Sequence, residues 1–178
     1  AAQAGHHVIM TPSEHCYIDL YQGEKSVEPD TYSMCRLSDS YNFSPVPEGI
    51  NPEMILGGQG NLWAESVPHF RHAEYMTWPR GWALSEVFWS GDKNKNWDDF
   101  IKRVEAHFVR ADRADINYAR SMYNAIITPY KENDTMYIDI ATEINGLEIY
   151  YTFDNTTPDR FSPRYTAPLT VPKDATWL

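Results

Sequence analysis

The segment Met54–Glu65 constrains the fold most, because its two faces would differ in kind. Successive side chains of a strand point to opposite sides of a sheet. One face would be small and apolar, fit to pack on helices, with Leu56, Gly58, Gly60, Leu62 and Ala64. The other would be polar and aromatic, with Gln59, Asn61, Trp63 and Glu65. We therefore expect a strand that packs on helices with one face and meets a ligand with the other.

A second strand is expected upstream of this segment. His7–Thr11 is a short apolar run that ends at Pro12, which is typical of a buried parallel strand. The two strands are separated by a polar, turn-rich stretch, Gln22–Asn51. A loop of that length inside a compact domain is usually functional or covers a site. The first part of the chain therefore alternates strands and helices.

Two helical regions follow the second strand. Ala73–Trp89 has a helical pattern that Pro79 should break, with the proline in the first turn of the longer helix. We assign to the core a stripe at helical spacing formed by Trp78, Trp82, Ser85 and Trp89. Asn96 is the expected N-cap of a second, amphipathic helix. Its apolar stripe consists of Trp97, Phe100, Ile101, Val104 and Phe108.

From Thr128 onward the hydrophobic pattern changes to the period of strands. Met136–Ile140 and Leu147–Phe153 alternate apolar and polar residues, and Asn145-Gly146 between them is a strong hairpin signal. A β-sandwich takes about 100 residues and about seven strands. This stretch supplies roughly half of that, so we expect the chain to end inside such a domain.

Composition excludes some functions and leaves others open. The net charge of −10 argues against a nucleic-acid partner, which needs a basic face. No stretch is long and apolar enough to span a bilayer, and Ala1–His7 lacks the features of a signal peptide. An aromatic fraction of 14% suits a sugar site as well as an aromatic core. Cys16 and Cys35 lack metal-ligand spacing and are either free thiols or, in an oxidising compartment, a pair.

Two short clusters could carry chemistry. Tyr17 and Asp19 follow the first strand and share a face in extended chain, while Trp63 and Glu65 lie at the end of the second. Ligands of β/α folds bind at the C-terminal ends of parallel strands. Each residue also has a structural explanation: Asp19 as a turn residue, Glu65 as a helix-start carboxylate, Trp63 as core. Their shared position favours a pocket for a hydroxylated ring.

At these residues the chain resembles glycoside hydrolase family 20. Val8–Ser13 through Asp19 is similar to the seventh barrel strand of that family, and Gly57–Glu65 to its eighth. Tyr75–Arg80, with Ala83–Val87, resembles the last barrel helix. The remainder resembles the β-domain that often follows the barrel, through the stretches Ile149–Asp154 and Tyr165–Pro168.

The resemblance implies a fold and a domain organisation. The expected fold class is α/β: the last two β/α units of a (β/α)8 TIM barrel with a trailing helix, then a partial all-β sandwich-like domain. Residues 1–127 would form the barrel part and residues 128–178 the truncated second domain. Because only about two of the eight strands are present, no closed barrel can form. Open strand edges would remain, through which a homo-oligomer could assemble.

The resemblance also implies an activity. The intact enzyme would be a glycosidase, a β-N-acetylhexosaminidase that removes terminal N-acetylglucosamine or N-acetylgalactosamine from glycans. Its retaining catalysis would be substrate-assisted, an exception to the usual two-carboxylate scheme, and would use no metal or organic cofactor. Tyr17 would orient the acetamide, Trp63 would wall the acetamide pocket, and Asp19 and Glu65 would hold outer hydroxyls. The resemblance further implies a secreted or periplasmic location.

The chain also departs from the family pattern. The adjacent Asp-Glu pair that orients the acetamide and supplies the acid lies on the fourth strand of the family, outside these 178 residues. Where many members place a Trp in the loop after the seventh strand, this chain offers only Tyr32, Tyr41 and Phe43. We therefore expect the isolated chain to be inactive. A non-catalytic carbohydrate-binding module and a purely structural domain remain the alternatives.

Overall fold

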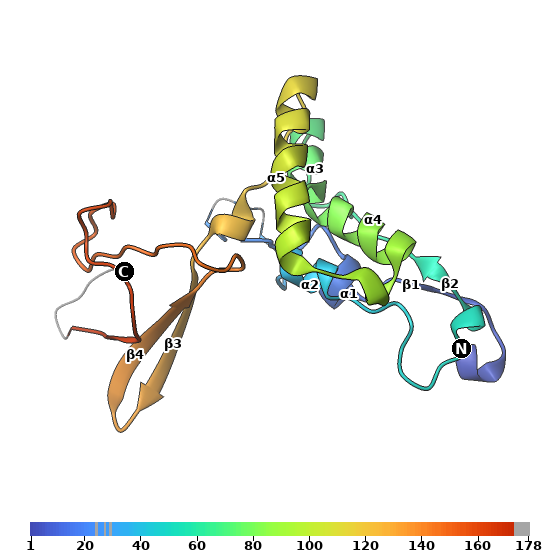
Figure 1. Ribbon diagram of the computed structural model, residues 1–178, viewed down its shortest axis with the longest axis horizontal. Coiled ribbons are helices and arrows are strands. Elements are labelled where there is room, and N and C mark those ends of the chain that lie inside the picture. The colour runs from blue at the N-terminus through green and yellow to red at the C-terminus, as the bar shows by residue number, and fades with distance from the viewer. Residues whose placement is uncertain (24, 27, 29, 173–178) are drawn as a thin grey trace. The chain divides into compact units, whose positions relative to one another are not determined.

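The computed structural model describes residues 1–23, 25–26, 28 and 30–172 (Figure 1). Contacts divide the chain into two compact units, Ala1–Met122 and Tyr123–Leu178. The first unit mixes helices with a parallel strand pair, and the second is built on an antiparallel sheet. The two units are therefore considered one at a time.

The first unit is organised around two short parallel strands, β1 (Val8–Met10) and β2 (Ile55–Gly58). Parallel hydrogen bonding continues beyond them, because the N–H of Ile18 donates to the carbonyl of Asn61 at 2.8 Å and the N–H of Asn61 to that of Cys16 at 2.8 Å. The strand expected over Met54–Glu65 therefore lies in the predicted place but was predicted too long, since regular strand geometry ends at Gly58. The chain beyond it is held by isolated pairing between Tyr17 and Asn61.

Helix α4 (Arg80–Ser90) packs against the small face of this segment. A Cβ on Gly60 would lie 2.9 Å from a methyl carbon of Leu84, and one on Gly58 would overlap the ring of Phe88. The core around this contact consists of Cys16, Ile18, Phe43, Leu84 and Val87, with Met10, Leu62 and Phe88 packed against it. The expectation for this face fails at both ends, since Ala64 is exposed and, at the start, Leu56 is 66% exposed. A register irregularity in the β1–β2 pairing and the positive φ of Gly57 break the alternation there.

The remaining helices of the unit are α1 (Ser13–Cys16), α2 (Leu37–Tyr41), α3 (Phe70–Thr77) and α5 (Trp97–Ala114). The predicted break at Pro79 is confirmed, with the proline directly before α4. The side chain of Asn96 caps α5 by accepting from the N–H of Asp99 at 3.0 Å, as predicted. The predicted core stripe is wrong over its second half, because Ser85 is exposed and Trp89 is 93% exposed, while Trp78 and Trp82 are half-buried. The buried face of α4 instead carries Arg80, Ala83, Leu84 and Val87.

In the second unit, β4 (Thr135–Ala141) lies between β3 (Ile126–Glu132) and β5 (Leu169–Thr170), all antiparallel. The turn joining β3 and β4 is Asn133-Asp134, both at positive φ. The hairpin predicted at Asn145-Gly146 is therefore wrong. Because β4 pairs with β3 on one side and with β5 on the other, Leu147–Phe153 does not pair with it. That stretch makes an isolated bridge between Tyr150 and Arg164 instead.

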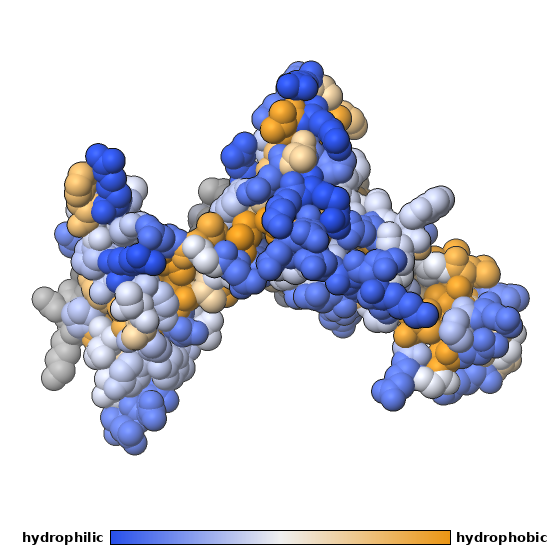
Figure 2. All heavy atoms as spheres, in the orientation of Figure 1, coloured by the Kyte–Doolittle hydropathy of each residue, from blue (hydrophilic) through white to orange (hydrophobic). Residues whose placement is uncertain are grey.

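Apolar side chains surround the strand pair of the first unit on the outside. Ile9 is 55% exposed, and Figure 2 shows apolar surface around the same end of the unit. A shallow apolar hollow near the N-terminus is lined by Val8, Met10, Ile50 and Ile55, among others. Each strand of the pair has one strand neighbour among the described residues. This surface is what a longer sheet would cover.

Candidate active site

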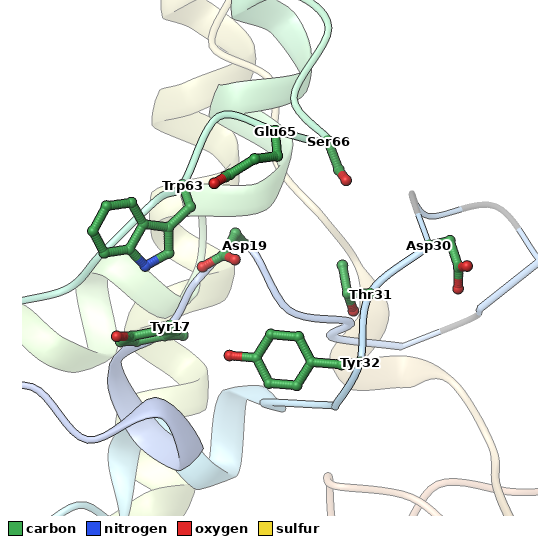
Figure 3. A pocket seen from close by; sticks show the side chains of 8 residues that line it. All are labelled: Tyr17, Asp19, Asp30, Thr31, Tyr32, Trp63, Glu65 and Ser66. Atoms are coloured by element: carbon green, nitrogen blue, oxygen red, sulfur yellow. The ribbon is translucent and has the colours of Figure 1, made fainter.

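A pocket of about 450 Å³ lies where the paired segments after β1 and β2 end (Figure 3). Its lining consists of Tyr17, Asp19, Asp30, Thr31, Tyr32, Trp63, Glu65 and Ser66. All four residues singled out from the sequence are therefore brought together on one concave surface. They come from two segments more than forty residues apart, joined through the Tyr17–Asn61 bridge.

Tyr17 and Trp63 form the aromatic side of the pocket. Their ring centroids lie 6.1 Å apart with an interplanar angle of 62°, an edge-to-face arrangement. Trp63 is 50% exposed, so half of a large apolar side chain remains in contact with solvent. Of the two sequence interpretations of Trp63, the core residue is excluded. An exposed indole beside a tyrosine hydroxyl provides a stacking surface and a hydrogen-bond donor within one pocket.

Asp19 is a carboxyl group whose pKa is shifted by the pocket. Burial raises the pKa of its carboxyl group, although hydrogen bonding from its own and the Trp63 backbone N–H groups and the charge of Arg80 lower that pKa. One carboxylate oxygen, Oδ1, is buried without a hydrogen-bond partner among the described residues. A buried polar atom without a partner is costly and calls for an explanation. Asp19 is thus partly buried in the pocket wall, with this oxygen closed to solvent.

Glu65 faces the same space from the other segment (Figure 3). Its negative charge contributes to the raised pKa of Asp19, so the two carboxylates interact. Carboxylates accept hydrogen bonds from hydroxyl groups. Two of them with a tyrosine hydroxyl and an indole face make a pocket suited to a neutral, hydroxylated ring.

The loop between the strands contributes the opposite wall, as its length predicted. Tyr32 is 76% exposed, and its hydroxyl points toward Tyr17 in Figure 3. Although most of the side chain is exposed, partial desolvation, followed by the negative charge of Asp19, raises the pKa of Tyr32. The other aromatic residues considered for this loop, Tyr41 and Phe43, are buried in the core. Of the three, Tyr32 alone lines the pocket.

Sequence reasoning missed several residues of the site. Asp30, Thr31 and Ser66 line the pocket, but polar residues in a turn-rich loop carry no pattern that marks them. Arg80 was also missed: it is fully buried at the start of α4 and reaches the backbone on both sides of Asp19. A charged residue at the start of a helix is usually interpreted as solvated, so its burial could not be inferred.

Possible metal ligands, membrane-spanning helices and cysteines were considered for the residues that the structure describes. No group of three or more His, Cys, Asp or Glu side chains gathers there in a way that could hold a metal ion. None of the described helices is long and apolar enough to cross a membrane. Cys16 and Cys35 are free and buried, and burial raises the pKa of Cys16 to about 12.

Comparison with known proteins identifies the fold and then the family. Residues 1–92 match the model of the glycosyl hydrolase family 20 catalytic domain, and residues 130–177 that of the chitobiase/β-hexosaminidase C-terminal domain. A family 20 β-N-acetylhexosaminidase of Streptomyces coelicolor superposes with a TM-score of 0.63, at 23% identity, over 67% of this chain and 25% of its own. A family 20 exo-β-N-acetylglucosaminidase of Vibrio harveyi superposes with a TM-score of 0.56, at 27% identity, over 67% and 20%. The fold is thus that of a glycoside hydrolase barrel segment.

Sequence relatives agree with the structural ones. A β-hexosaminidase of Porphyromonas gingivalis is 34% identical over 95% of this chain and 23% of its own length. A β-N-acetylhexosaminidase of Cellulomonas fimi is 32% identical over 68% and 25%. The chain belongs to glycosyl hydrolase family 20. It spans about a quarter of the length of these relatives.

Proposed function

We propose that the whole protein is a β-N-acetylhexosaminidase that releases terminal N-acetylglucosamine or N-acetylgalactosamine from glycans, and that the pocket of this chain binds the released sugar. One observation carries the proposal. Tyr17, Asp19, Trp63 and Glu65 line a single pocket in a chain that belongs to a glycoside hydrolase family. The relatives named β-hexosaminidase support the activity.

Catalysis in this proposal is substrate-assisted. The acetamide oxygen of the substrate attacks the anomeric carbon as the glycosidic bond breaks, and an oxazolinium intermediate forms. Water then opens that intermediate with net retention. The acid that protonates the leaving oxygen comes from a part of the protein outside this chain. Tyr17 donates a hydrogen bond to the acetamide oxygen and holds it in line for attack.

The other three residues bind the sugar without taking part in bond making. Trp63 offers its half-exposed face to the acetamide group. Asp19 and Glu65 accept hydrogen bonds from hydroxyls at the far side of the ring. The position of both carboxyl groups on the pocket wall supports this role, because carboxylates accept hydrogen bonds from hydroxyls.

The test compares two chromogenic substrates with the purified whole protein. An aryl β-N-acetylglucosaminide should be hydrolysed, and the matching aryl β-glucoside, which has no acetamide, should not. Equal rates on the two would contradict substrate assistance. No release from either substrate, under conditions where the protein is folded, would contradict the activity.

Sugar binding by the isolated chain is a second candidate function. The pocket is formed within residues 17–66, whereas the general acid, which typically contributes about 10²–10⁴-fold, lies elsewhere in the family. The isolated chain is therefore expected to bind N-acetylglucosamine without hydrolysing glycosides. Titration followed by tryptophan fluorescence tests binding, with Trp63→Phe as the control that should lose the signal. Chromophore release by the isolated chain above a buffer blank would contradict this expectation.

A further inference from the structure

The side chain of Arg80 makes an unusual set of contacts for a buried cation. Its guanidinium is completely excluded from solvent, and its two terminal nitrogens donate to four neutral backbone carbonyls. The hydrogen-bond lengths are 2.9 Å to Leu20, 2.8 Å to Cys35, 2.5 Å to Ile18 and 2.7 Å to Met76. Its remaining nitrogen, Nε, has no partner among the described residues. Burial lowers the pKa of Arg80, yet a guanidinium stays protonated in proteins.

Two of these carbonyls belong to the residues on either side of Asp19. The carbonyl of Ile18 lies in the peptide plane that precedes Asp19, and that of Leu20 lies in the plane one residue beyond it. The N–H of Ile18 in turn donates to the carbonyl of Asn61 at 2.8 Å. The backbone on both sides of Asp19 is therefore held by hydrogen bonds, which limits the directions in which its carboxylate can enter the pocket.

The other two carbonyls connect this segment to the rest of the site. Cys35 ends the loop that carries Tyr32, and its own N–H donates to the carbonyl of Tyr21 at 2.7 Å. Met76 lies in α3, one helix before Arg80 itself. A single side chain thus joins the Asp19 segment, the loop and two helices. A lysine has three donors on one flexible atom and could not reproduce this fixed fork.

We propose that Arg80 is a positioning residue that sets the Asp19 carboxylate at its sugar-binding place. Arg80 acts through backbone carbonyls and touches no substrate, so its effect on the reaction passes through Asp19. The inference rests on the proposed function, in which Asp19 accepts a hydrogen bond from a sugar hydroxyl. Because that contact exists in ground and transition states alike, its loss should appear in KM rather than in kcat.

A double-mutant cycle on the whole protein tests this role. Arg80→Lys is measured alone and in an Asp19→Asn background, with an aryl β-N-acetylglucosaminide as substrate. Alone, Arg80→Lys should raise KM about tenfold with kcat little changed, since hydrogen bonds to charged groups contribute at that level. In the Asp19→Asn background it should change KM by less than about twofold, because the two effects share one contact.

The control separates positioning from general loss of stability. Val104→Ala removes a completely buried side chain of α5, which lies outside the pocket, and lowers the melting temperature. At a matched loss of melting temperature it should leave KM unchanged, whereas Arg80→Lys should not. Equal KM changes in both variants would show that instability alone explains the effect, and would overturn the inference.

The remaining outcomes are also decisive. A full tenfold effect of Arg80→Lys in the Asp19→Asn background would show that Arg80 acts independently of Asp19, leaving the proposed function intact. An Asp19→Asn variant with the KM of the wild type would remove the proposed role of Asp19 and this inference together. If Arg80→Lys does not fold, Arg80→Gln takes its place in the cycle. Failure of both variants to fold would assign Arg80 to folding alone and overturn the positioning role.

Discussion

The two faces of Met54–Glu65 have different surroundings: one packs against α4 and the other lines the pocket. Toward α4 the segment presents Gly58 and Gly60, and the helix side chains come so close that a Cβ would collide with them. Toward the pocket it presents Trp63 and Glu65, which remain exposed. The middle of the first face, around Gly58 and Gly60, is covered by α4 within this unit. The second face is open to the pocket, where Trp63 and Glu65 are exposed.

From this difference we expect substitutions on the two faces to have opposite effects on stability and activity. Changes on the packing face should cost stability and leave the chemistry of the folded protein alone. Changes on the pocket face should cost activity and little stability. The variants below test this contrast on the segment itself and at Tyr17 and Asp19, which line the same pocket from the other segment.

The largest effect is expected from Tyr17→Phe in the whole protein. Its hydroxyl is proposed to hold the attacking acetamide oxygen in line, and misplacement by about 1 Å can cost about 10²-fold in rate. We expect kcat to fall by about 10²-fold while KM changes little. Steady-state kinetics with an aryl β-N-acetylglucosaminide measure both. If kcat stays within about twofold of wild type, Tyr17 merely packs against Trp63.

Gly58→Val should be the most damaging change on the packing face. Its Cβ would overlap the Phe88 ring, and overpacking of this kind typically costs about 1–3 kcal/mol. Urea unfolding of the 178-residue chain, followed by tryptophan fluorescence, measures the loss. The matched control is Gln59→Ala, one residue along on the exposed side, which should stay within about 0.5 kcal/mol of wild type. Equal losses in the two variants would show that the faces do not differ.

Glu65→Gln should produce a smaller effect of a different kind. Its carboxylate is proposed to hold an outer hydroxyl in both ground and transition states, so removing the charge should raise KM about tenfold with kcat little changed. The same kinetic assay provides the answer. A fall in kcat equal to the fall in kcat/KM would instead place Glu65 in contact with the reacting atoms.

The contrast also explains which features the sequence could predict. The parallel strand pair of the first unit, the break at Pro79 and the cap at Asn96 follow from local patterns and were found close to where they were expected. The pocket face was predictable because Gln59, Asn61, Trp63 and Glu65 violate the composition of a core strand. The hairpin at Asn145-Gly146 failed because the partners of β4 are set by distant pairing, with Leu169–Thr170 on one side. The burial of Arg80 could not be predicted for a similar reason, because its four acceptors lie on segments up to 62 residues away.

The smallest effect, Asp19→Asn, should increase stability while weakening sugar binding. Burial raises the pKa of Asp19, and the charge of Glu65 adds to that effect, while backbone N–H groups and the charge of Arg80 only partly oppose it. The folded state therefore disfavours the carboxylate relative to the unfolded chain. A neutral amide of the same shape removes this cost. Because solvent screens charges in a pocket that is partly open, we expect a gain of only about 0.5–1 kcal/mol at pH 7.

The pH dependence of that gain identifies its cause. A carboxyl group whose pKa is raised by folding contributes stability at low pH and loses that contribution as pH rises through its folded pKa. The Asp19→Asn variant has no such loss, so the difference in unfolding free energy between variant and wild type should be largest at neutral pH. It should vanish below about pH 3.9, where Asp19 is protonated in both states. Urea unfolding of both proteins across this range tests the sign. A variant that is less stable than wild type at pH 7 would mean that the carboxylate is fully stabilised without a ligand, and the pocket face would then be as complete as the packing face.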